Sequence, residues 1–265
     1  MRFQSIASGS SGNCIYVGSD STHILVDVGI SGKRTELALN NIGLKTSEID
    51  AIFITHEHSD HIAGLGVLTK KYNIPIYASE GTIKGIKNSC RNVSFDDSIF
   101  HVIKADEKVT VKDITVNPLK ISHDALEPLA MRVYCEGKKC AVVTDLGTYD
   151  DYTIGSLLGM DVILCEANHD IRMLETGPYP YPLKRRILGN KGHLSNESGG
   201  RLISELLNDN VKHIYLGHLS KENNMPELAY ETVRLEITAS DTKYDGNDFP
   251  ITVARRDIPC ELLEF

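Results

Sequence analysis

Residues 53–64, FITHEHSDHIAG, place three histidines and one aspartate within six consecutive positions. The apolar run AIFIT leads into this cluster, and the segment IAGLGVLTKKY follows it. The whole chain has only 10 histidines, and a hydrophobic core could not give hydrogen-bond partners to so many imidazoles in one place. The cluster therefore indicates that its side chains bind a shared ligand.

Length and composition indicate a globular protein of one large domain or two small ones. The chain has 265 residues, of which 41% are hydrophobic and 24% are charged, values that are ordinary for a globular protein with a sizeable core. The sequence has no internal repeat and no polar segment long enough to act as a linker. We expect a single domain over residues 1–265.

The ends of the chain and the cysteines bear on its compartment. The first residues, MRFQSIASGSSGNC, lack the long apolar segment of a secretory signal, and no stretch approaches the roughly 18 apolar residues of a membrane span. The six cysteines have no framework spacing, so we expect reduced thiols. These features predict a cytoplasmic protein that does not enter a membrane.

Apolar runs and helical spacing alternate along the chain. Strands are predicted over residues 14–19, 23–29, 51–55, 74–79, 109–122, 129–137, 138–147, 161–168, 211–220 and 251–256. Helices are predicted over residues 32–43, 64–72, 196–208 and 225–237. Two β-rich halves, each followed by helices, predict two packed sheets with helices outside them.

The histidine cluster has the residue types of a metal site. Imidazole and carboxylate groups are the natural ligands of zinc, manganese and iron. Alternate residues of an extended loop point to the same side, so His56 and His58 can reach one ion together. Asp60 and His61 follow where the loop turns toward a helix, and they can reach a second ion. A close pair of ions suits hydrolysis, because it can activate a water molecule near neutral pH.

Further ligands are expected where later strands end. Three candidates follow apolar runs: His123 in LKISHD, Asp145 in AVVTDLG and His218 in IYLGHLS. A carboxylate such as Asp145 can bridge two ions. Asp27, at the end of ILVDVG, is expected to orient a ligand histidine from behind.

The order THEHSDH, His123, Asp145, His218 resembles the metallo-β-lactamase fold over essentially the whole chain. The resemblance implies an α+β protein, a four-layer αβ/βα sandwich with two mixed sheets and helices on the outer faces. It also implies that one metal ion is bound by His56, His58 and His123, and the other by Asp60, His61 and His218, with Asp145 bridging. The second ligand set contains no cysteine, which disfavours antibiotic hydrolysis and leaves thioester, lactone and phosphodiester hydrolases.

Two further segments resemble the RNase Z group of phosphodiesterases. VILCEAN ends a strand with Glu166, and KGHLSNESGG opens a helix with His193. By this resemblance, His193 stabilises the transition state and protonates the leaving oxygen. The resemblance also implies that Glu166 keeps the imidazole of His193 charged and correctly oriented. Asp60 or Asp145 is then expected to accept the proton of the attacking hydroxide. Ser195 stands where that group more usually has a threonine, as does Asn168. The alternative is that His193 is an exposed residue beside a helix capped by Ser195.

Candidate substrate contacts surround this segment. The basic side chains could contact phosphates flanking the cut, which the net charge of −8 does not exclude. A solvated surface is the alternative for the basic residues, and a structural role is the alternative for His169. The candidates are Lys184, Arg185, Arg186, Lys191, Asn168 and His169.

The segments ASGSSGNC, EANHD and GHLSN, without a large inserted cap domain, resemble the YycJ/WalJ (VicX) group of bacterial proteins. The resemblance implies a metal-dependent 5′-exonuclease acting on DNA, with two divalent transition-metal ions, zinc, manganese or iron. It also allows a flexible loop over residues 8–13 near the mouth of the site, or a turn without functional contact. Two other functions stay open: a small-molecule thioester or lactone hydrolase, and a metal-organised binding protein without turnover.

Overall fold

The computed structural model describes residues 1–265, and the chain forms two compact units. The first unit comprises Met1–Lys120, Ala125–Gly137 and Arg255–Phe265, and the second comprises Ile121–Asp124 and Lys138–Ala254. Both units are interrupted in sequence, so no single linker divides them. The prediction of one domain over the whole chain stays a prediction.

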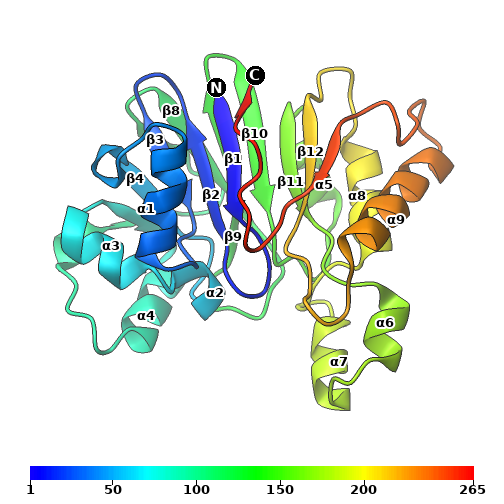
Figure 1. The fold of residues 1–265 in the computed structure, drawn as a ribbon, viewed down its shortest axis with the longest axis horizontal. Coiled ribbons are helices and arrows are strands. Elements are labelled where there is room, and N and C mark those ends of the chain that lie inside the picture. Colours follow the sequence, from blue (N-terminus) through cyan, green and yellow to red (C-terminus); the bar gives the residue numbers. More distant parts are fainter. The chain divides into compact units, whose positions relative to one another are not determined.

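A seven-stranded mixed sheet forms the centre of the first unit (Figure 1). Its strand order is β14-β1-β2-β3-β4-β5-β6. The strands β1, β2 and β3 pair antiparallel, whereas β3 to β6 pair parallel. The bounds are β1 (Arg2–Ala7), β2 (Cys14–Gly18), β3 (His23–Val26), β4 (Ala51–Phe53), β5 (Ile76–Ala78), β6 (Phe100–Val102) and β14 (Leu263–Glu264).

The rest of the first unit consists of helices and an antiparallel meander. The strands β7, β8 and β9 pair antiparallel in order. Their bounds are β7 (Val109–Val111), β8 (Ile114–Lys120) and β9 (Leu129–Cys135). The helices are α1 (Gly32–Asn41), α2 (Ser59–Ile62), α3 (Leu65–Tyr72) and α4 (Glu80–Ser89), with short 3-10 turns η1 (Thr46–Glu48) and η2 (Asp97–Ile99).

Parallel strands form the centre of the second unit. Neighbouring strands in the order β10, β11, β12, β13 pair parallel, so their carboxyl ends meet at one edge. Their bounds are β10 (Lys138–Val143), β11 (Val162–Glu166), β12 (His213–Gly217) and β13 (Ile251–Val253). The helices are α5 (Asp151–Leu157), α6 (Ile171–Thr176), α7 (Tyr181–Ile187), α8 (Asn196–Leu206) and α9 (Pro226–Ala239).

Local sequence explains where several helices begin. Ser31 caps α1, and Ser79 caps α4, each through a hydroxyl that accepts the backbone N–H of the third residue after it. Ser195 caps α8 in the same way, as predicted. Pro226 occupies the first turn of α9, where no N–H partner is needed.

The predicted strands and helices are confirmed with shifted ends, but several elements were not predicted. These are the strands β1, β6 and β14 and the helices α2 and α4 to α7. The predicted strand over residues 109–122 is two strands, because Lys112 and Asp113 turn the chain between β7 and β8. No helix has the length and apolar character that crossing a membrane requires.

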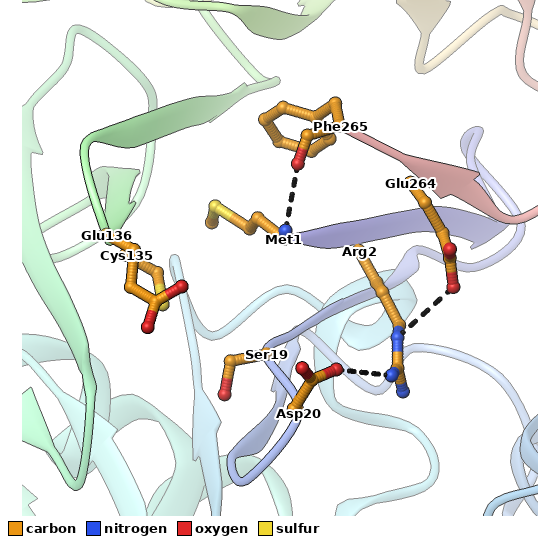
Figure 2. A pocket seen from close by; sticks show the side chains of 8 residues that line it. All are labelled: Met1, Arg2, Ser19, Asp20, Cys135, Glu136, Glu264 and Phe265. Atoms are coloured by element: carbon orange, nitrogen blue, oxygen red, sulfur yellow. Dashed lines mark hydrogen bonds and ion pairs between the residues drawn. The ribbon is translucent and has the colours of Figure 1, made fainter.

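The two ends of the chain meet within the first unit (Figure 2). The Met1 amine donates to the Phe265 carbonyl oxygen at 2.9 Å, and β1 pairs with β14. Arg2 forms ion pairs with Asp20 at 2.7 Å and with Glu264 at 3.4 Å. These contacts fix the edge of the first sheet.

Candidate metal and phosphodiester site

The histidine cluster of the first unit lies between β4 and α3. The backbone leaves β4 in an extended form and enters α2 directly after His58. The rings of His56 and His58 are 4.6 Å apart between centroids, and those of His56 and His61 are 4.0 Å apart. His56 and His61 are buried, whereas Asp60 is partly exposed. The predicted ligands of this loop are therefore gathered in one place.

A buried carboxylate orients two of these histidines. His61 Nδ1 donates to Asp27 Oδ2 at 2.7 Å. A histidine that binds a metal through one ring nitrogen commonly donates the other N–H to a carboxylate in this way. Thr55 donates its backbone N–H and its hydroxyl to the two oxygens of Asp27, both at 2.8 Å. The same hydroxyl lies 3.0 Å from His56 Nδ1. Thr55 was not singled out from the sequence, although it directly precedes the cluster.

Asn13 connects the glycine- and serine-rich loop to this cluster. Its Oδ1 accepts from Gly9 N at 2.9 Å, and its Nδ2 lies 3.1 Å from His61 Nε2. Its backbone N–H donates to the Asp60 carbonyl at 2.8 Å. Asn13 is 2% exposed, so these bonds are shielded from water. The loop over residues 8–13 therefore contacts the predicted ligands.

Gly29 makes this close packing possible. Its backbone N–H donates to the Asn13 carbonyl at 2.7 Å. A Cβ atom at this position would lie 1.6 Å from the Asp60 carbonyl oxygen and 2.8 Å from the Asn13 nitrogen. Only glycine fits, so the segment after β3 can pack directly behind the cluster.

The second unit brings four acidic and imidazole side chains together. Asp145 follows β10, Glu166 ends β11, His218 follows β12, and His193 lies just before α8. One ligand atom from each lies within 4.8 Å of all the others. Parallel strands deliver such residues to one edge of a sheet, which explains why positions so far apart in sequence meet. Of the four, only His193 has an appreciably exposed side chain, at 12%.

Glu166 is the centre of this group. Its Oε1 accepts from His193 Nδ1 at 2.8 Å and from His218 Nδ1 at 3.0 Å. Its Oε2 accepts from the backbone N–H groups of Leu146 at 2.8 Å and Leu194 at 3.2 Å. Burial alone would raise the pKa of Glu166, but the two imidazoles lower this pKa to about 2. The carboxylate is therefore anionic at neutral pH.

The imidazole orientations fit metal binding. His123 Nδ1 donates to the Gly192 carbonyl at 3.1 Å, and His218 Nδ1 is held by Glu166, so Nε2 of both rings faces Asp145 Oδ1. These Nε2 atoms lie 3.6 Å and 3.4 Å from that oxygen. Ligating histidines characteristically use one nitrogen for the metal and the other for such a support. The donor set of imidazoles and buried carboxylates suits divalent transition metals.

Three predicted site residues have an unusual backbone conformation. Asp27, Asp145 and His218 have φ angles of 60°, 59° and 57°, in the left-handed region that side chains rarely adopt. Each follows the end of a strand, where the chain must turn sharply and still present a polar side chain. Such a conformation costs of order 1 kcal/mol per residue and is concentrated at functional sites.

Two of the four predicted basic contacts are already engaged. Lys184 Nζ donates to the carbonyls of Glu175 and Gly177, both at 2.8 Å. Arg186 pairs with both oxygens of Asp124, with Nε–Oδ2 at 2.5 Å and Nη2–Oδ1 at 2.9 Å. These contacts brace α7, whereas Arg185 on the same helix is exposed, as is Lys191 beyond it.

The predicted contacts Asn168 and His169 are buried. Asn168 Nδ2 donates to the His218 carbonyl at 2.8 Å. His169 is 1% exposed, its Nδ1 lies 3.3 Å from Asn168 Oδ1, and its Nε2 has no hydrogen-bond partner. Burial lowers the pKa of His169 to about 4, so its ring is neutral at pH 7. Asn168 thus supports His218 from behind.

Comparisons with known proteins found similar sequences. The profile of the beta-lactamase superfamily domain matches residues 22–218. The chain is 41% identical to exodeoxyribonuclease YycJ of Bacillus anthracis, with 88% of each chain covered. It is 40% identical to exodeoxyribonuclease WalJ of Streptococcus pneumoniae, with 99% of this chain and 97% of the relative covered.

Solved structures share the architecture. The metallo-beta-lactamase fold protein YhfI from Bacillus subtilis superposes with a TM-score of 0.70 at 16% identity, over 98% of each chain. Likeness at that identity shows the fold alone. The predicted α+β metallo-β-lactamase fold with two mixed sheets is confirmed.

Proposed function

The chain belongs to the beta-lactamase superfamily and, within it, to the group of the YycJ and WalJ exodeoxyribonucleases, and from that premise we propose that it is a metal-dependent hydrolase that removes nucleotides from DNA. The direction of cutting that we propose is from the 5′ end, in the cytoplasm of a bacterium. The two relatives are named as exodeoxyribonucleases, and the chain matches nearly their full length.

One observation carries the proposal from a general hydrolase to a phosphodiesterase. The buried carboxylate of Glu166 holds the partly exposed His193 by a 2.8 Å hydrogen bond, next to Asp145 and His218. A thioester or lactone hydrolase has no evident use for this pair. A phosphodiester, by contrast, has a leaving oxygen that must take up a proton.

We assign the ions to the two ligand sets that the resemblance to the metallo-β-lactamase fold implies. His56, His58 and His123 would hold one divalent ion, and Asp60, His61 and His218 the other, with Asp145 as the bridging carboxylate. When bound, such ions supply Lewis acidity that activates water and neutralises the charge on a phosphate. Zinc, manganese and iron all accept these ligands.

Side chains of the protein itself transfer the protons in this proposal. Because His193 Nδ1 donates to Glu166, the proton for the leaving oxygen comes from His193 Nε2. The low pKa of Glu166 keeps that carboxylate anionic, so it can accept the Nδ1–H of His193. Asp60 is the proposed acceptor of the proton released by the attacking water. Asp27 and Thr55 hold the first-unit imidazoles in place through the contacts described above.

Arg185 and Lys191 are the proposed phosphate contacts of the second unit, because both are exposed. Lys184 and Arg186 would serve mainly by fixing α7, on which Arg185 lies. Asn168 and His169 would act from the interior, by supporting His218 and by shaping the wall behind His193.

The test is a nuclease assay on 5′-phosphorylated, end-labelled DNA and RNA, single- and double-stranded, with zinc, manganese or iron added to metal-free protein. We expect mononucleotides from the 5′ end of DNA, no product in EDTA, and little turnover of a glutathione thioester. Turnover of the thioester without DNA cleavage would favour the small-molecule hydrolase. Fully metallated protein that cleaves nothing would favour a binding protein.

A further inference from the structure

A groove on the first unit adjoins the histidine cluster. Its volume is about 660 Å³, within the range of pockets that bind small ligands. One wall is formed by α2 and α3, and the other by the segment that follows α4. The lining residues are Ser59, Ile62, Ala63, Gly66, Val67, Lys70, Ser89, Cys90, Asn92, Val93 and Ser94. None of them serves in the proposed metal site.

The walls of this groove combine apolar and polar side chains. Val93 packs against the backbone of Gly66, where a Cβ atom would lie 2.8 Å from the valine methyl group. Val67 is 60% exposed, so its side chain is accessible to a ligand in the groove. Val67 and Lys70 are three positions apart in α3, so both lie on the face of this helix that lines the groove. Apolar side chains such as Val67 and Val93 can pack against the face of a nucleobase.

The charge of the groove is complementary to a phosphate. Lys70 is exposed and forms no ion pair, and no acidic side chain lines the groove. That is notable in a chain with a net charge of −8. A lone lysine above apolar walls can pair with a backbone phosphate while a base lies below it.

The groove is continuous with the cluster through Ser59. This residue lies between His58 and Asp60 in the chain and also lines the groove. We infer that the groove binds a nucleotide of a single DNA strand next to the phosphate that is cut, with its base against Val67 and Val93 and its phosphate on Lys70. This inference rests on the proposed nuclease function, and it adds a binding site for the substrate strand.

The experiment measures binding without cleavage. The full chain is kept in EDTA and titrated into a 5′-phosphorylated single-stranded oligodeoxynucleotide that carries 2-aminopurine near its 5′ end. The variants Val67→Glu and Lys70→Glu are expected to weaken binding about tenfold and to reduce the change in 2-aminopurine emission.

Matched controls separate the groove from general charge effects. Val102→Glu changes a valine that is 55% exposed on β6, and Lys108→Glu reverses an exposed lysine before β7. Neither residue lines the groove, so both controls are expected to bind as the parent does. All four side chains are exposed, and thermal unfolding confirms that the variants fold.

The outcomes distinguish this inference from the proposed function. If the groove variants bind the oligonucleotide as tightly as their controls while metallated parent cleaves DNA, the groove assignment is overturned and the nuclease stands. If the groove variants lose binding but no metal supports cleavage by the parent, the groove stands and the nuclease function is overturned.

Discussion

The two clusters of predicted ligands are built in different ways. In the first unit, all four ligands come from one six-residue stretch after β4. In the second unit, the predicted ligands His123, Asp145 and His218 follow three different strands, β8, β10 and β12, at positions spread over residues 123–218. The first cluster is supported by several short side chains, whereas the second is organised by the single carboxylate of Glu166.

This difference separates two sources of precision. A short loop can place ligands only if other segments hold it, and Asp27, Thr55 and Asn13 do so. Strand ends are already fixed by the sheet, and Glu166 aims His193 and His218 while the Gly192 carbonyl aims His123. Close backbone approach occurs in both clusters: a Cβ atom on Gly29 would meet the Asp60 carbonyl, and one on Gly199 would lie 2.3 Å from the Glu166 carbonyl.

The largest expected effect concerns the second cluster. His193→Ala removes the proposed proton donor, so turnover of DNA should fall by about 10²- to 10⁴-fold. The metal content should stay that of the parent, because His193 is not a proposed ligand. His101→Ala, a ring that stacks on Tyr77 outside the proposed site, is the control for turnover and for metal content by elemental analysis. Parental turnover by the His193 variant would remove this residue from the mechanism.

The next effect concerns the support of the first cluster. Asp27→Asn keeps the shape but removes the charge behind His61, so metal affinity should fall by about 10- to 100-fold. Competition with a chelator of known affinity measures the change. Asp50→Asn is the matched control. Asp50 accepts the backbone N–H of His23 and forms an ion pair with Lys112, and it contacts no predicted metal ligand. Equal affinities of the two variants would contradict the supporting role of Asp27.

The loop over residues 8–13 gives a smaller effect on stability. Asn13→Ala leaves several buried donors and acceptors without partners, including the N–H and the carbonyl of Gly9. The free energy of unfolding should therefore fall by about 3 kcal/mol. Urea titration of metal-free protein measures this difference. Asn40→Ala, an exposed asparagine on α1, should change stability very little. A loop that merely turns the chain would make both variants equal.

The smallest effect is the pH dependence contributed by His169. The pKa of His169 is about 4 in the folded state, below the ordinary value of 6.5. As the pH falls from 6.5 to 4, the His169 ring is therefore protonated in the unfolded chain but not in the folded one. The stability contributed by neutral His169 is complete above pH 6.5 and is lost over that range. His169→Asn should therefore reduce the stability lost between pH 7 and 4.5 by about 2 kcal/mol. Urea titrations of metal-free protein at both pH values check this, and an unchanged loss would mean that His169 titrates normally.

Much of the fold and the polar candidates could be predicted because their signals are local. The spacing of His56, His58, Asp60 and His61 lies within one loop, and Asp145 and His218 directly follow apolar strands. The short helices α5 to α7 carry too few apolar positions to show a clear helical period, and β1 mixes polar with apolar residues. None of these four elements was therefore predicted.

Contacts between distant segments could not be predicted. Arg186 looks like a phosphate contact in sequence, but its partner Asp124 lies 62 positions away. Asn13 meets His61 across 48 positions, through a loop that reads only as rich in glycine and serine. Such pairings depend on how sheets and loops pack, which the local pattern does not encode.

The number of bound ions per chain tests the central claim most directly. Metal-free protein loaded with zinc or manganese and freed of excess ions should contain about two ions per chain, as expected for a two-metal hydrolase. His58→Ala in the first unit and His218→Ala in the second should each lower that number, whereas His193→Ala should not. A parent without bound metal, or ligand variants that keep both ions, would contradict the claim.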